Sequence, residues 1–290
     1  EEELASLRAE RDELRHERDE LRERVEDLEA RVREFEAEHE AERALSTGAP
    51  VGAESPTPAR ALAGTTLFVR YDSKAEPTLD DAEEADQSVI DANLSLEHHT
   101  TFDATDATVD GEPYETFLRE TPAFRFVSWA ARELPFEILD TGHRTDLAGL
   151  YDALLDADRA ELNKTVSVGE GENEESRTFD VVLCDRMGEP LAVAELNASR
   201  DPVTSEEMEA LVAAAETVRR GANALGAALY VTSSFFEPDA LEAAADATAS
   251  GGLLDRSDKE SYVRMDRKTG FHLCLAEDRD GSFHVTMPDL

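Results

Sequence analysis

Residues 178–197, TFDVVLCDRMGEPLAVAELN, contain two apolar runs with a turn-forming segment between them. The runs are Thr178–Cys184 and Leu191–Asn197, and each has the length and apolar character of a strand. Met187-Gly188-Glu189-Pro190 separates them and contains Gly and Pro, which interrupt regular structure. Two strand-like runs at this spacing predict a β-hairpin.

The sequence before the hairpin predicts a helix and a strand. Thr145–Leu155 carries an apolar stripe at helical spacing, with Thr145 or Asp146 as N-cap. Ala160–Val168 predicts a strand, and the polar segment 169–175 predicts the turn that joins it to the hairpin.

The sequence after the hairpin predicts a second helix and a buried strand. Thr204 begins a Thr-x-x-Glu capping box, which predicts a helix over Ser205–Asn223 that ends before Gly226. The near-continuous apolar run Ala227–Phe235 is typical of a strand buried on both faces. Together these segments predict an αβββαβ core at about 145–235.

The rest of the chain extends this core into an α/β fold, a mixed α+β globular domain over residues 66–290. A Pro- and Gly-containing segment over 45–65 predicts a flexible linker before the domain. The remaining predicted elements are strands over 66–71 and 93–102, one or two helices over 112–134 interrupted near Pro122, a helix over 238–247 and an antiparallel meander over 261–288.

Residues 1–44 show a sustained seven-residue repeat, which is typical of a coiled coil. In a parallel in-register dimer every g-to-e′ pair joins opposite charges. The sequence therefore predicts a homodimer through a parallel coiled-coil helix, and the alternative is a single solvated helix with i,i+4 Glu–Arg pairs. Because the chain begins within a heptad and without Met, we expect the coiled coil to continue before Glu1. The d residues are Leu7, Leu14, Leu21, Leu28 and Phe35; the g residues Glu3, Glu10, Glu17, Arg24 and Arg31 face Arg8, Arg15, Arg22, Glu29 and Glu36.

The composition excludes several classes of protein. The 290 residues carry a formal charge of -38, and only four of the 29 basic residues are lysine, a combination that resembles proteins of salt-loving archaea. Concentrated salt screens such a charge, so the acidity argues only weakly against a nucleic-acid partner. Two cysteines predict a reducing, cytoplasmic setting. No apolar run approaches the ~18 residues of a membrane span, so no membrane partner is expected.

The hairpin also carries acidic residues in a pattern that points to metal chemistry. Asp180 lies in the first predicted strand, and Glu195 and Asn197 lie in the second, on one face by period-two alternation. Pairing of the strands would bring Asp180 alongside Glu195. Two adjacent carboxylates supply the oxygen ligands that Mg²⁺ prefers.

The element order and these acids resemble the PD-(D/E)xK nucleases of the restriction-endonuclease-like superfamily. In that family two carboxylates hold Mg²⁺, and a lysine two residues after the second acid orients the attacking water or stabilises charge on the scissile phosphate. The resemblance implies that Asp180 and Glu195 are metal and catalytic residues and that Asn197 stands where the family has lysine. An amine would then have to come from Lys164, on the preceding strand, or a cation from Arg200.

Two functions are compatible with this resemblance and with the replacement of the family's lysine by Asn197. Because Asn197 is neutral, the sequence favours a coiled-coil-dimerised adaptor or nucleic-acid-associated module whose degenerate nuclease-like domain does not cleave. The alternative is an active Mg²⁺-dependent phosphodiesterase acting on DNA or RNA, and only that alternative requires Mg²⁺.

Other candidate sites have less support. The sequence contains no P-loop, dinucleotide-binding, nucleophile-elbow or zincin motif. His98 and His99 are adjacent on a predicted strand, so their side chains point to opposite faces and do not share a metal. We interpret both as surface histidines.

Overall fold

A computed structural model describes residues 55–168, 175–222, 224–248, 264–265, 271–279 and 282–285. These described residues belong to one compact unit. The coiled coil over 1–44 and the turn over 169–174 lie outside the described residues, so both stay predictions.

The predicted hairpin is confirmed. Strand β6 (Glu175–Cys184) pairs antiparallel with β7 (Pro190–Asn197), with Val181 opposite Ala194 and Val182 opposite Val193. In the turn, Asp185 Oδ1 accepts the N–H groups of Met187 and Glu189, each at 2.8 Å. Gly188 has φ 94°, a left-handed conformation that glycine adopts without strain.

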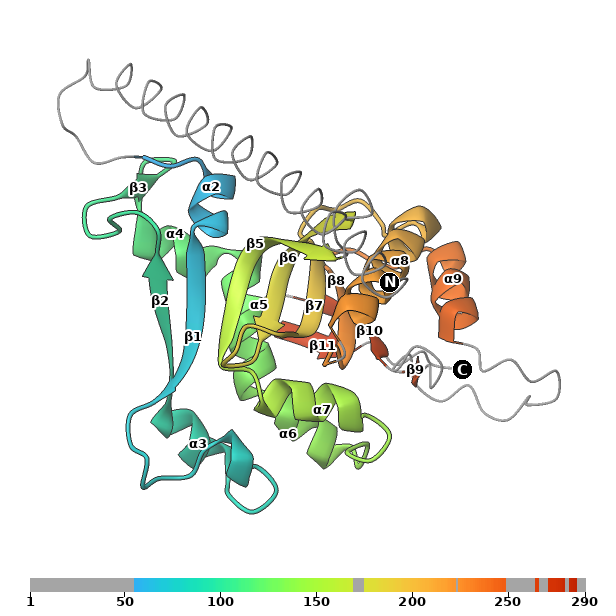
Figure 1. The fold of residues 1–290 in the computed structure, drawn as a ribbon, viewed down its shortest axis with the longest axis horizontal. Coiled ribbons are helices and arrows are strands. Elements are labelled where there is room, and N and C mark those ends of the chain that lie inside the picture. The colour runs from blue at the N-terminus through green and yellow to red at the C-terminus, as the bar shows by residue number, and fades with distance from the viewer. Residues whose placement is uncertain are drawn as a thin grey trace, which may run out of the picture. The chain divides into compact units, whose positions relative to one another are not determined.

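The hairpin lies in the middle of a nine-stranded sheet (Figure 1) with the order β11-β10-β8-β7-β6-β5-β1-β2 and a short strand, β9, beside β10. Strands β7, β8 and β10 are parallel neighbours, and the other pairs are antiparallel. The predicted C-terminal meander is thus part of the main sheet. The bounds are β1 Thr65–Tyr71, β2 Leu94–Thr100, β5 Arg159–Val168, β8 Ala227–Thr232, β9 Arg264–Met265, β10 His272–Arg279 and β11 Ser282–Val285.

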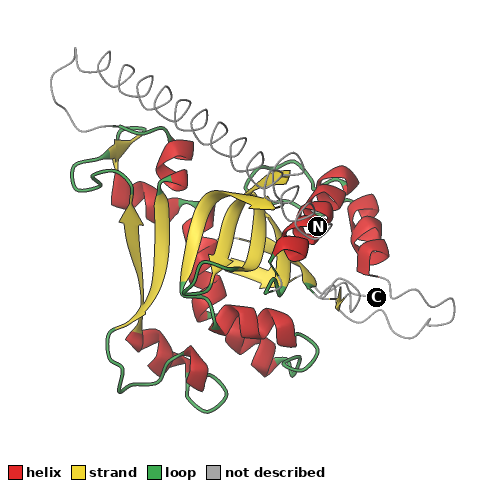
Figure 2. Cartoon of the chain, in the orientation of Figure 1, coloured by secondary structure: helices red, strands yellow, loops and turns green. Residues whose placement is uncertain are grey.

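Helices cover both faces of the sheet (Figure 2), and the alternation of the hairpin assigns its residues to the two resulting cores. Val181 and Ala194 belong to the core that includes Leu150 of α7. Val182 and Val193 belong to the core that includes Leu211 of α8. The first face carries α5 (Pro122–Arg132), α6 (Leu134–Asp140) and α7 (Ala148–Leu155), and the second carries α8 (Ser205–Gly221) and α9 (Pro238–Thr248).

The smaller elements lie around the β1–β2 ribbon and the start of α5. The single Trp, Trp129 of α5, is 2% exposed and anchors the first core. The smaller elements are α2 (Pro58–Ala63), η1 (Leu79–Asp81), α3 (Gln87–Asn93), α4 (Tyr114–Glu120) and the two-stranded sheet of β3 (Thr108–Val109) and β4 (Glu112–Pro113).

Several sequence-based boundaries differ from those of the structure. The linker predicted over 45–65 contains α2, because the Thr57 hydroxyl caps that helix by accepting the N–H of Arg60 and Pro58 starts it. Helix α7 begins after Leu147, without a side-chain cap, instead of at Thr145 or Asp146. Helix α8 ends at Gly221 and β8 at Thr232, short of their predicted ends.

None of the described helices has both the length and the apolar character that crossing a membrane requires.

Candidate functional site

The two predicted acids meet where the β-ladder around them is interrupted. The β5–β6 register passes from Leu162↔Val181 to Lys164↔Phe179 and omits Asn163 and Asp180, and Asn163 has φ 46°. A left-handed residue of this kind kinks a strand, so Asn163 and the residue opposite it, Asp180, do not pair in the ladder. The Asp180 side chain points to β7, where its Oδ2 accepts the backbone N–H of Leu196 at 2.7 Å.

This detour places Asp180 against Glu195, and the predicted convergence is confirmed. The β6–β7 ladder ends at Val181↔Ala194, and the next two residues in the same register are Asp180 and Glu195. Their side chains hydrogen bond to each other. The adjacent strands therefore hold two carboxyl groups in direct contact.

The acid pair, Asp180 and Glu195, holds a proton at neutral pH. Burial raises the pKa of Glu195 to about 8, and the neighbouring charge and hydrogen bond of Asp180 add to the shift. Burial also raises the pKa of Asp180, but the hydrogen bonds from the Leu196 N–H and from Glu195 oppose that rise. The pair therefore holds a proton more tightly than two separate carboxyl groups would.

Two further residues that sequence reasoning did not assign to the site extend the acid pair. Tyr230 of β8 is 6% exposed and lies opposite Glu195 in the parallel β7–β8 register. Its phenol hydrogen bonds to Glu207 of α8; burial and the charges of Glu207, Glu195 and Asp180 raise its pKa. Glu207 also accepts from the Thr204 N–H at 2.8 Å in the capping box. The only signal of Tyr230 in the sequence was its position at the centre of the buried strand.

Among the described residues, Asp180 and Glu195 form no ion pair with a lysine or arginine, and the predicted amine has another partner. Lys164 Nζ lies 2.6 Å from Glu161 Oε2. Although burial opposes the effect, hydrogen bonds from Lys164 and Arg159 hold the pKa of Glu161 below its ordinary value. Neither Lys164 nor Arg200 contributes to the pKa shifts of the two acids. The predicted amine is thus engaged elsewhere.

Asn197 serves the turn after β7 instead of the acid pair. Its Nδ2 donates to the Asp201 carbonyl at 2.9 Å, and its Oδ1 accepts the N–H of Ser199 at 2.9 Å and its hydroxyl at 2.7 Å. Close by, the Arg200 carbonyl accepts the Ser234 hydroxyl at 3.0 Å. The structure therefore brings together Asp180 and Glu195 but adds neither Asn197 nor Lys164 to their contacts.

The oxygen donors of the acid pair fit the chemistry of Mg²⁺, which uses one or two carboxylates and retains several waters. Ligation requires that Glu195 lose its proton. Within the described ranges, no group of three or more His, Cys, Asp or Glu side chains is arranged to hold a metal ion.

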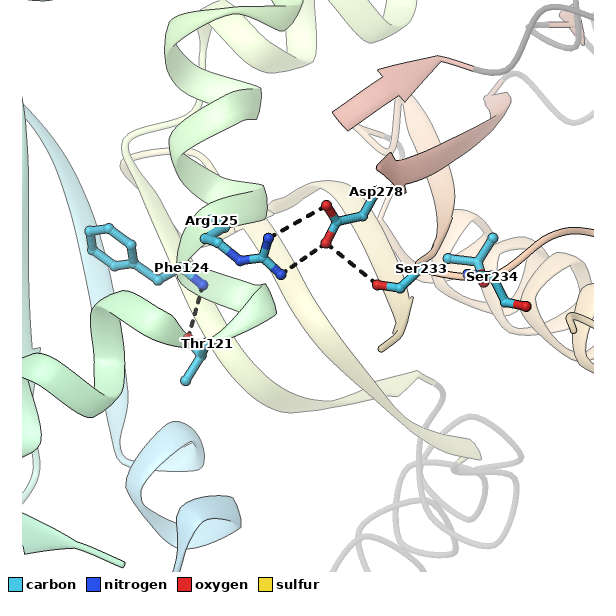
Figure 3. Close-up of polar contacts among 7 residues, drawn as sticks. Thr121, Phe124, Arg125, Ser233, Ser234 and Asp278 are labelled. Atoms are coloured by element: carbon cyan, nitrogen blue, oxygen red, sulfur yellow. Dashed lines mark hydrogen bonds and ion pairs between the residues drawn. The ribbon is translucent and has the colours of Figure 1, made fainter. Parts of the chain in front are cut away.

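A second polar cluster lies where the parallel strands β8 and β10 end (Figure 3). Arg125 of α5 contacts both carboxylate oxygens of Asp278 of β10, at 2.8 and 3.4 Å, and the Ser233 hydroxyl lies 3.4 Å from Asp278 Oδ2. The Arg125 guanidinium also lies 5.7 Å from the centre of the Phe283 ring. Because the Asp278 side chain is only 7% exposed, these contacts join α5 to the sheet and do not present a free charge.

The chain was compared with protein-family models, curated proteins and solved structures. A family model described as "Domain of unknown function (DUF7527)" matches residues 57–290. No curated protein and no solved structure matches the chain.

Proposed function

Since the chain belongs to the DUF7527 family, whose description names no activity, we propose from its own residues that the domain is a non-catalytic binding module with a nuclease-like core. The element order α7-β5-β6-β7-α8-β8 supports this proposal, because β5, β6 and β7 are antiparallel and β8 is parallel to β7. The order of these elements is the one that the resemblance to PD-(D/E)xK nucleases implies.

The acid pair carries the argument against catalysis. The PD-(D/E)xK nucleases cleave phosphodiesters with two metal-binding carboxylates and a cation near the scissile phosphate. Here the carboxylates converge, but Asn197 stands at the lysine position and Lys164 is held by Glu161 at 2.6 Å. The site therefore has two adjacent carboxyl groups and lacks the third component.

In the proposed function the domain binds a protein or nucleic acid without cutting it, and the coiled coil over 1–44 joins two such domains. The charge of -38 makes any nucleic-acid binding depend on a local basic surface and on salt. A dimer presents two copies of the binding surface, which raises its avidity for a repeated partner.

A cleavage assay tests the loss of catalysis. The full chain is incubated in molar KCl with Mg²⁺ or Mn²⁺ and with labelled single- and double-stranded DNA and RNA. We expect no cleavage above the background of an Asp180→Asn, Glu195→Gln double variant, which keeps the shape of both side chains. Cleavage by the wild type that this folded double variant lacks would establish the nuclease alternative.

The convergence of the two carboxylates is the observation that favours the alternative, an Mg²⁺-dependent phosphodiesterase. Isothermal titration with Mg²⁺ or Mn²⁺ measures the affinity of the acid pair directly. If the pair binds metal, the affinity increases with pH up to about 8, because Glu195 must first release its proton. Absence of binding at pH 9, where both acids are ionised, would leave only the non-catalytic function.

Deletion of residues 1–44 tests the proposed dimer. We expect the full chain to sediment as a dimer at micromolar concentration in molar KCl and the truncated chain as a folded monomer, because every g-to-e′ pair of the parallel coil is attractive. Sedimentation of the full chain as a monomer would contradict the coiled coil.

A further inference from the structure

Strand β2 is the outermost strand on one side of the sheet (Figure 1). It pairs with β1 over seven residues, from Thr65↔Thr100 to Tyr71↔Leu94, and no strand among the described residues lies on its other side. Such an edge presents backbone N–H and C=O groups to any strand that can approach it.

The hydrogen bonds around β2 show which of its residues point outward. The Thr101 N–H donates to the Gly64 carbonyl and the Asp72 N–H donates to the Asn93 carbonyl, both at 2.9 Å, so the odd-numbered residues of this strand bond to β1. The backbone groups of its even-numbered residues therefore point away from β1. Val69, opposite Leu96, agrees with this pattern, because its N–H donates to Asp158 on the far side at 2.9 Å.

Three of the outward residues remain available. The Leu94 N–H donates to the Ile90 carbonyl, and the Leu94 carbonyl accepts from Arg132 at 2.6 Å. Leu96, His98 and Thr100 have no outward backbone partner within the described part of the chain. These three consecutive outward positions are centred on His98.

We propose that β2 pairs antiparallel with β2 of a second copy of this chain, with the two-fold axis at His98. In this register Leu96 faces Thr100 of the second copy and His98 faces His98. Each of these hydrogen-bonded pairs exchanges two N–H···O bonds, so all three available residues of both copies are satisfied.

The side chains favour the same register, because an imidazole can donate a hydrogen bond to a carboxylate. Glu97 and His99 are exposed on one face of β2, and in this register Glu97 lies directly opposite His99 of the second copy, twice by symmetry. Both are non-hydrogen-bonded positions, where the side chains approach most closely. Moving the axis to Glu97 places two carboxylates opposite each other. Moving it to Glu97 or to His99 also leaves outward backbone groups unpaired.

This edge contact is too small to hold two free chains together, because a stable interface buries many more residues on each side. It therefore rests on the coiled-coil dimer proposed above, which supplies a high local concentration of the second copy. Thirteen residues, 45–57, separate the predicted coil from α2 and reach at most about 45 Å. That length allows two domains on one coil to meet edge to edge.

Disulfide cross-linking of the full chain tests the register. Both native cysteines, Cys184 and Cys274, are buried, so the wild type provides the background. We expect His98→Cys to form a disulfide-linked dimer under mild oxidation, because opposed Cα atoms about 5.5 Å apart suit a disulfide. Thr100→Cys is the matched control: it is on the same face of β2, but the two copies lie about 13 Å apart and should not cross-link.

A charge exchange in the His98→Cys variant tests the side-chain pairs. Glu97→Arg should lower the cross-linking yield several-fold. Addition of His99→Glu should restore it, because the introduced arginine then faces the introduced glutamate of the second copy. Sedimentation of the reduced full chain distinguishes failure of the edge pairing from failure of the coiled coil. A dimer in which His98→Cys cross-links no better than Thr100→Cys overturns the edge pairing alone, whereas a monomer overturns the coiled coil and the edge pairing with it.

Discussion

Replacement of Glu195 by Gln should stabilise the domain relative to the wild type, and the difference in the free energy of unfolding should grow as pH rises from about 5 to about 8. The folded-state pKa of Glu195 is about 8, above the 4.5 of a free glutamate. Between these values the folded chain holds a proton that the unfolded chain has lost, so the wild type loses stability as pH increases. The glutamine side chain of the variant keeps a donor for Asp180 and has no proton to lose.

The size of this effect depends on how much solvent reaches the acid pair. One pKa unit corresponds to ~1.4 kcal/mol, and partial exposure of Glu195 reduces the full shift, so we expect a gain of about 2 kcal/mol at pH 9 relative to pH 5. Denaturant unfolding in molar KCl at both pH values measures it. Glu209→Gln, at an exposed position of α8, is the control and should show no such pH dependence. Parallel pH profiles for wild type and Glu195→Gln would contradict a shared proton.

Replacement of Arg125 by Met should destabilise the domain by about 3 kcal/mol, at the lower end of the range for breaking a buried ion pair. Asp278 is 7% exposed and would lose both contacts with the guanidinium, and the Ser233 hydroxyl would be its remaining side-chain partner among the described residues. The sheet and α5 would also lose the contact of the guanidinium with the Phe283 ring.

Arg119→Met is a matched control for this prediction. Arg119 also pairs with an acid, Glu115 at 3.0 Å, and its guanidinium also lies 5.7 Å from a ring centre, that of Phe124. Its ion pair is 60% and 63% exposed, so we expect a loss below ~1 kcal/mol. Equal losses for the two variants, measured by thermal unfolding in the same salt, would show that burial of Asp278 does not determine the effect. Asp278→Asn added to Arg125→Met should recover part of the loss.

At the site, the contact between the two acids was predictable from the sequence, but the contact between Glu207 and Tyr230 was not. Alternation placed Glu195 within a strand, and the Gly-Pro turn fixed which residues of the hairpin face each other, so the convergence with Asp180 was predictable. Glu207 was visible only as a helix cap. Its bond to Tyr230 joins α8 to β8, and no local pattern states which turn of a helix lies over which residue of a strand.

The amine prediction failed for a related reason. Lys164 lies on the strand beside β6, and residue order alone allowed it to approach Asp180. In the structure Lys164 pairs instead with Glu161, three residues earlier, and its Nζ lies 2.6 Å from Glu161 Oε2. Competition among neighbouring acids depends on side-chain distances of a few Å, and in a chain with 67 acidic residues the sequence offers many competitors.

Local sequence signals specify the hairpin at 178–197, the strands and helices around it and the meeting of Asp180 with Glu195, because period-two alternation, turn residues and capping residues act within a few positions of one another. Tertiary structure alone decided that β10 joins β8 in parallel, that Arg125 meets Asp278 across 153 residues, and that Leu96, His98 and Thr100 lie on an edge that no described strand covers. These features depend on which surfaces remain uncovered after the core has packed, and packing is a property of the whole chain.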